Sequence, residues 1–88
     1  MATDITLTFD EIIAASRCRR EWLLELIDED IISISGRPEH TQFSGFQLAR
    51  IRRARRISRD FEASVPATAL ILQLLDELET LRKGRLED

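Results

Sequence analysis

Two short helical segments separated by a tight turn occupy the first third of the chain. Residues 8–15 and 19–29 have helical spacing of apolar positions, and residues 16–18 join them. Thr8 is a candidate N-cap, and Glu11, three residues later, completes a capping box. Two short helices joined by so short a turn predict a helix-turn-helix.

The predicted second helix is acidic at positions where a helix that reads DNA needs to be basic. Glu21, Glu25 and Asp28 lie four and three residues apart, so they share one helical face. DNA affinity comes largely from neutralising phosphates with Lys and Arg. The carboxylates of this face would instead repel the phosphates. The pattern therefore favours a protein partner, with a merely solvated face as the alternative. The buried side of the same helix is predicted to hold Leu23, Leu26 and Ile27.

Charge is distributed unevenly along a chain whose net charge is only −3. Residues 1–30 hold eight acids and three bases, residues 31–62 three acids and seven bases, and residues 63–88 five acids and three bases. A basic middle therefore lies between acidic ends. With 88 residues, we expect one small domain over residues 1–88.

The middle of the chain predicts a hairpin and then a third helix. Residues 31–35 and 41–43 resemble short strands, and the turn residues 36–40 join them, which is the pattern of a wing. Asp30 is expected to end the second helix in the left-handed conformation. Ser44 or Gly45 can cap a third helix that runs to about Ala63. Its predicted inner face consists of Leu48, Ile51, Ala54, Ser58 and Phe61.

The opposite face of this third helix is rich in arginine. Four guanidinium groups on one helix can bind nucleic acid phosphates or an acidic protein surface. The alternative is a solvated face that pairs locally with Asp60 and Glu62. The four residues are Arg52, Arg53, Arg56 and Arg59.

A leucine-rich fourth helix is predicted over residues 65–83, with Pro66 in its first turn. Its apolar positions alternate spacings of three and four, which is typical of a seam between helices. Leu70, Leu72 and Leu75 widen the apolar surface, so this helix needs two packing partners. The domain can supply one and a second subunit the other, which predicts a homodimer. The residues of the seam are Ile71, Leu74, Leu78 and Leu81.

The sequence contains few residues that suggest catalysis or metal binding. No phosphate-binding glycine loop and no Ser/His/Asp set is visible, so we expect no enzyme and no cofactor. His40 stands alone without ligands at metal-binding spacing, and no metal is expected. Cys18 is the only cysteine, which fits a reducing cytoplasm. No segment is apolar for long enough to span a membrane.

The order of helix-turn-helix, wing, basic helix and leucine-rich helix resembles the MerR-like fold. The blocks ITLTF, ELIDEDII, RRARRISRDFEASVPA and LLDELETL resemble the chaperone-modulator family CbpM over nearly the whole chain. The resemblance implies a mainly α, MerR-like winged helix-turn-helix of about four helices with a short two-stranded wing. The sequence departs from the family pattern at Arg17, where glycine is common, and at Asp28 and Asp30.

The resemblance also implies a function. Members of this family bind the J domain of a CbpA-like co-chaperone, block its productive encounter with Hsp70 (DnaK), and are thought to act as dimers. J domains carry a basic helix, which would fit an acidic surface on this chain. The first candidate surface is Glu21, Trp22, Leu24, Glu25 and Asp28, with Trp22 or Leu24 as the apolar anchor. A second acidic candidate on the last helix is Asp76, Glu77 and Glu79. The alternative function is a small MerR-like DNA-binding transcriptional regulator that uses the arginines of the third helix.

Overall fold

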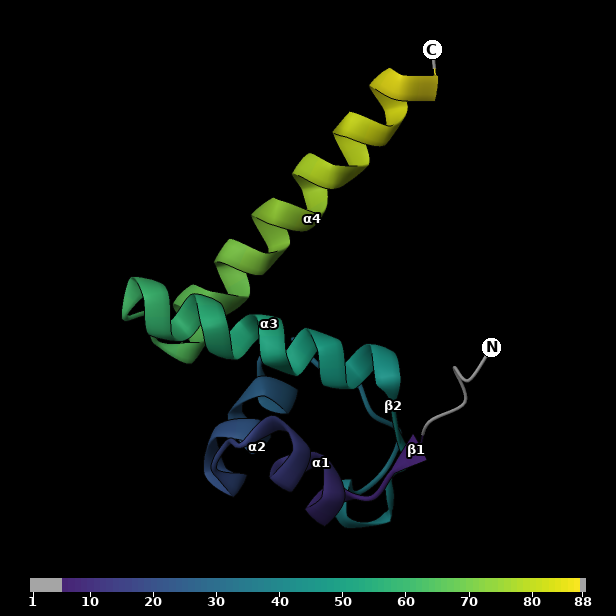
Figure 1. Ribbon diagram of the computed structural model, residues 1–88, viewed down its shortest axis with the longest axis vertical. Coiled ribbons are helices and arrows are strands. Elements are labelled where there is room, and N and C mark those ends of the chain that lie inside the picture. Colours follow the sequence, from purple (N-terminus) through teal and green to yellow (C-terminus); the bar gives the residue numbers. More distant parts are fainter. Residues whose placement is uncertain (1–5, 88) are drawn as a thin grey trace.

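The computed structural model describes the backbone of residues 6–87 and the side chains of residues 6–84. Within that range it holds four helices and one small antiparallel sheet, so the predicted mainly α fold is confirmed. Figure 1 shows α1 and α2 on one side of α3, and α4 projecting away from its other side. The elements are β1 (Thr6–Leu7), α1 (Phe9–Ser16), α2 (Arg20–Asp28), the short 3-10 helix η1 (Pro38–His40), β2 (Phe43–Ser44), α3 (Gly45–Phe61) and α4 (Val65–Glu87).

Capping boxes begin α1 and α3. The Thr8 side chain accepts a hydrogen bond from the Glu11 amide, and the Glu11 carboxylate accepts one from the Thr8 amide, as predicted. Ser44 and Gln47 repeat this arrangement at the start of α3. Gln47 also donates to the carbonyl of Ser33 at 3.0 Å, so this cap anchors the loop that precedes it.

Left-handed residues end the first two helices. Arg17 has φ 57° directly after α1, and Asp30 has φ 60° two residues after α2. The conformation at Asp30 was predicted, and Arg17 occupies a position where helix-turn-helix turns often have glycine. The reversal at Arg17 lets α2 start after only three residues, which sets the helix-turn-helix geometry.

The strand pairing differs from the predicted hairpin. β2 pairs with β1, with Thr6 opposite Ser44 and Leu7 opposite Phe43, while residues 31–35 form no strand. Ile31 and Ile32 are consecutive and both buried, whereas the side chains of a strand alternate between its two faces. Residues 31–35 therefore run as a loop, which allows both isoleucines to be buried in the core.

The core lies between α3 and the helix-turn-helix. Ile51, Ala54 and Ile57 form the buried face of α3. The prediction placed Ser58 and Phe61 on that face, but Ser58 is only half-buried and Phe61 is 67% exposed. Phe61 is the last residue of α3, at the turn into α4, and Ile57 takes the buried position instead. The fully buried large residues from the other elements are Ile12, Leu23, Leu26, Ile32, Phe43, Thr68 and Leu72.

Only the first part of α4 joins the core. Val65, Thr68 and Leu72 are buried, and Ile71 and Leu75 are half-buried. The C-terminal part of the helix projects from the rest of the molecule, as Figure 1 shows. A row of leucines along the outer side of α4 is 48–68% exposed: Leu70, Leu74, Leu78 and Leu81.

Candidate interaction surfaces

The exposed side of α2 carries three acidic residues and one leucine. Positions 21, 24, 25 and 28 follow the spacing of one helical face, and Leu24, at its edge, is 37% exposed. Glu21, Glu25 and Asp28 are all exposed, and none makes an ion pair with another described residue. We call these four residues, Glu21, Leu24, Glu25 and Asp28, the acidic α2 face.

Trp22 lies apart from this face. It is half-buried, packs against the core, and lines a hollow together with Cys18 and several arginines. One residue step turns a helix by about 100°, which carries Trp22 away from Glu21. Of the two predicted anchors, the structure brings only Leu24 together with the carboxylates.

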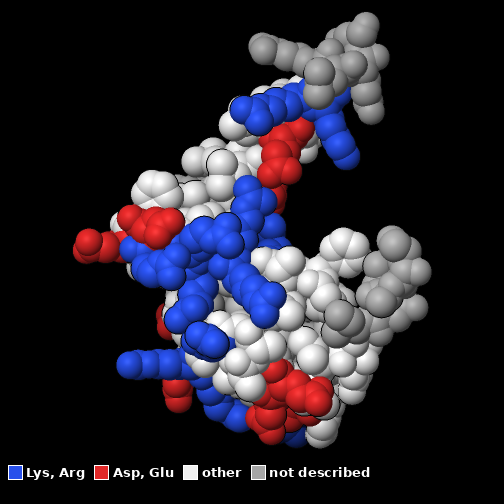
Figure 2. Space-filling view, viewed as in Figure 1, with Lys and Arg blue, Asp and Glu red and all other residues white. Residues whose placement is uncertain are grey.

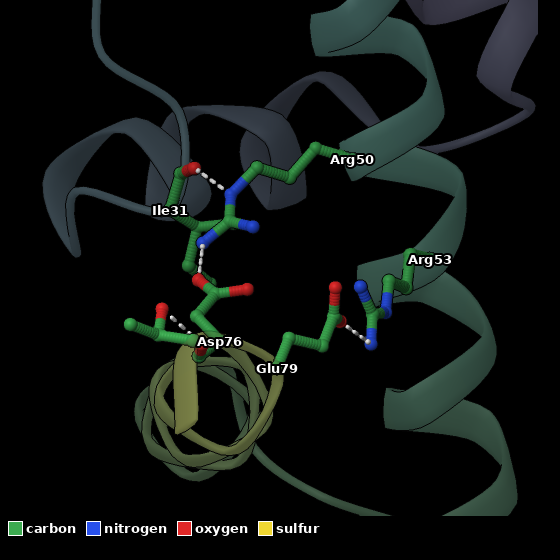
Figure 3. A network of polar contacts seen from close by, with 6 residues as sticks. Ile31, Arg50, Arg53, Asp76 and Glu79 are labelled. Carbon is green, nitrogen blue, oxygen red and sulfur yellow. Dashed lines mark hydrogen bonds and ion pairs between the residues drawn. The ribbon is translucent and has the colours of Figure 1, made fainter. Parts of the chain in front are cut away.

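The second acidic candidate takes part in contacts within the molecule (Figure 3). Asp76 Oδ2 lies 3.1 Å from a guanidinium nitrogen of Arg50, and Glu79 Oε1 lies 3.3 Å from one of Arg53. Arg50 Nε also donates to the carbonyl of Ile31 at 2.8 Å. These contacts tie α4 to α3 and to the loop after α2. Glu77 alone among the three is exposed without an ion pair to the described residues.

The arginines of α3 divide between two environments. Arg53 faces α4 through its pair with Glu79, whereas Arg52, Arg56 and Arg59 turn toward the end of α1 and the helix-turn-helix turn. There they meet arginines that the sequence pattern alone did not assign to this surface. We call the combined set the basic hollow: Arg17, Arg19, Arg52, Arg55, Arg56 and Arg59.

Two adjoining depressions make up the basic hollow, with volumes of about 220 and 410 Å³. Arg17, Arg55 and Arg59 line both of them. Figure 2 shows the basic side chains gathered across the middle of the molecule, over α3, with acidic side chains in separate groups outside this band. The helical periodicity of the third helix could not identify Arg17 and Arg19, because these two residues approach α3 only once the turn has folded.

The packing of α4 partly buries one residue of the predicted seam and leaves the other three exposed. Ile71 is half-buried against the core, whereas Leu74, Leu78 and Leu81 are exposed. Leu70, which is 56% exposed, joins these three on the outer side of the helix. The exposed row is a surface that a partner helix can cover.

Within the described residues, no group of three or more His, Cys, Asp and Glu side chains is placed to hold a metal ion. No helix in this part of the chain is both long and apolar enough to cross a membrane.

Comparison with known proteins places the chain among regulatory proteins. Residues 7–86 match the family described as "MerR HTH family regulatory protein". A "Chaperone modulatory protein CbpM" from Coxiella burnetii (strain Dugway 5J108-111) is 33% identical over 78 residues, which are 88% of this chain and 74% of that relative. A protein of the same name from Pseudomonas entomophila (strain L48) is 32% identical over 63 residues, which are 70% of this chain and 62% of that relative.

Proposed function

Because the chain belongs to the CbpM family of chaperone modulatory proteins, with a MerR-like fold, we propose that it binds the J domain of a CbpA-like co-chaperone. Bound there, it blocks the productive encounter of the J domain with Hsp70 (DnaK) and lowers J-stimulated ATP hydrolysis. The protein acts as a regulator without catalysing a reaction.

The observation that carries this proposal is the exposed acidic α2 face. Its carboxylates have no ion pairs with other described residues, and the basic helix of a J domain is the complementary surface. Charge complementarity mainly speeds and orients association. Affinity also needs an apolar anchor, and the exposed Leu24 beside these carboxylates can supply it.

The inhibition follows from mass action. Hsp70 and this protein compete for one J-domain surface, so the free J domain falls as regulator is added. At a free regulator concentration about ten times its Kd, roughly nine-tenths of the J domain is occupied. No change within the J domain is required.

A homodimer forms part of the same proposal. The exposed leucine row on α4 can pair with its copy in a second protomer, which leaves α2 of each protomer open. We place this activity in the cytoplasm, where a free thiol such as Cys18 stays reduced.

The alternative is a DNA-binding regulator, which the name of the matching family and the basic hollow favour. In winged helices, however, base readout belongs mainly to the second helix of the helix-turn-helix. Here that helix exposes Glu21, Glu25 and Asp28, which repel phosphates. We therefore favour a J domain over DNA as the binding partner.

A calorimetric titration of the protein with an isolated CbpA-like J domain tests the proposal. We expect saturable binding near one J domain per chain, and progressive loss of that binding when Hsp70 is added. Titration heats that fail to saturate, together with saturable binding of a labelled DNA duplex, would favour the alternative.

A further inference from the structure

The basic hollow concentrates positive charge from two distant parts of the chain. Arg17 and Arg19 come from the turn before α2, and the other four arginines come from the middle and end of α3. The two depressions share three guanidinium groups, so they form one continuous surface. Bringing six like charges together is unfavourable, and a bound anion offsets that repulsion.

The described part of the protein neutralises little of this charge. Arg59 is the only one of the six that pairs with a carboxylate there, at 3.5 Å from Asp60, and both side chains are more than half exposed. Arg52 donates to the carbonyl of Ala15 at 3.3 Å. Solvent screening makes exposed pairs of this kind weak. The hollow therefore keeps most of its capacity to bind an anion.

The floor of the larger depression is not purely basic. Trp22 and Cys18 line it beside Arg17, Arg19, Arg55 and others. A half-buried indole next to guanidinium groups suits a ligand that combines negative charge with an apolar side chain. Carboxylates match this surface because guanidinium groups bind them in a bidentate manner.

The surroundings of the hollow limit the length of the ligand. Asp60, whose carboxylate lies 3.5 Å from Arg59, and Glu62 follow Arg59 at the end of α3. A nucleic acid gains its affinity by contacting many basic residues along its backbone, so it would extend onto these carboxylates. A short segment of protein can end before it reaches them.

We propose that the basic hollow is a second binding site, which takes a short acidic segment of another protein with Asp or Glu on both sides of an apolar residue. This site is separate from the acidic α2 face and does not depend on the binding of a J domain. It gives the protein two separate surfaces of opposite charge.

Trp22 provides a direct test because it is the only tryptophan in the chain. The probe is the pentapeptide Glu-Asp-Leu-Asp-Glu, acetylated at its N-terminus and amidated at its C-terminus, and its control has Gln and Asn at the acidic positions. We expect the acidic peptide to change Trp22 fluorescence saturably, and the neutral peptide to leave it unchanged. An oligothymidylate and a DNA duplex of matched charge are titrated in parallel.

Two double variants identify the site. R55Q/R59Q removes two arginines that line both depressions, and we expect about tenfold weaker peptide binding. R82Q/K83Q makes the same charge change on exposed positions of α4, and we expect less than about a twofold effect, because exposed distant charges are screened. Equal thermal unfolding midpoints for the two variants show that both are folded.

Equal peptide affinity in the two double variants overturns the proposal, and so does the absence of saturable peptide binding to the wild type. Tighter binding of either nucleic acid than of the acidic peptide also overturns it, in favour of a nucleic acid site. The titration contains no J domain, so its result is independent of the proposed J-domain binding.

Discussion

At the residue scale, Arg17 combines a structural cost with a position in the basic hollow. It has φ 57°, a conformation that costs a residue with a Cβ atom about 1–2 kcal/mol. Glycine would avoid this cost, and the chain has arginine there. Arg17 lines both depressions and adds positive charge to them, which gives a physical reason for the residue.

Arg17→Gly and Arg17→Ala separate the two effects. Both variants remove the guanidinium group, but only glycine removes the Cβ atom from the left-handed region. We expect Arg17→Gly to be more stable than Arg17→Ala by about 1 kcal/mol, which corresponds to roughly 4–8 °C in Tm. Thermal unfolding followed by circular dichroism measures this difference. Equal melting temperatures would contradict the strain assigned to Arg17.

At the element scale, two arginine–carboxylate pairs hold the projecting helix α4 against α3. The pairs resemble each other in exposure but differ in their surroundings. Arg50 also donates to the carbonyl of Ile31, whereas Arg53 has no further hydrogen bond to a described residue. The Arg50 contacts therefore join three segments of the chain.

We expect Arg50→Ala to destabilise the fold by about 1–2 kcal/mol, because it breaks an ion pair and leaves the Ile31 carbonyl without this donor. Arg53→Ala removes only an exposed pair, so its expected cost is below about 1 kcal/mol. Urea unfolding of the two variants provides the comparison. An equal or greater loss of stability in Arg53→Ala would show that the contact with Ile31 contributes nothing.

Sequence periodicity was sufficient to predict the helices, but it could not predict the contacts between elements. The capping box at Thr8 and the left-handed Asp30 were predictable because both depend on a few neighbouring residues. The pairing of β1 with β2 was not, since it joins residues nearly forty positions apart and replaced a plausible local hairpin. In the same way, the acidic α2 face is visible in the sequence, whereas the basic hollow required the folded turn.

At the scale of the whole molecule, the chain presents three different surfaces. The acidic α2 face and the basic hollow lie on the helix-turn-helix side, and the exposed leucine row lies on α4. Contiguous exposed apolar residues on a small protein often mark an interface. The α4 row is therefore the surface through which we propose that two protomers pair.

Leu74→Glu combined with Leu78→Glu tests the proposed dimer. We expect the wild type to have about twice the chain mass of 10.2 kDa, and the double variant to be a monomer, because each burial of a leucine contributes about 1.5–3 kcal/mol. Sedimentation velocity measures the mass. Q73E/T80E adds the same charge at other exposed positions of α4 and should remain dimeric. A monomeric wild type, or a dimeric leucine variant, would contradict the proposal that the exposed leucines of α4 form the dimer interface.

The measurement that tests the central claim most directly compares J-domain affinity among three charge reversals, each replacing an exposed glutamate with lysine. E25K alters the acidic α2 face, E77K alters the acidic group on α4, and E62K is the matched control after α3. We predict that E25K weakens J-domain binding about tenfold or more, since it removes one favourable charge and adds a repulsive one at the contact, while E62K and E77K stay close to wild type. Unchanged affinity in E25K would rule out the acidic α2 face as the binding surface, and a loss confined to E77K would move that surface to α4.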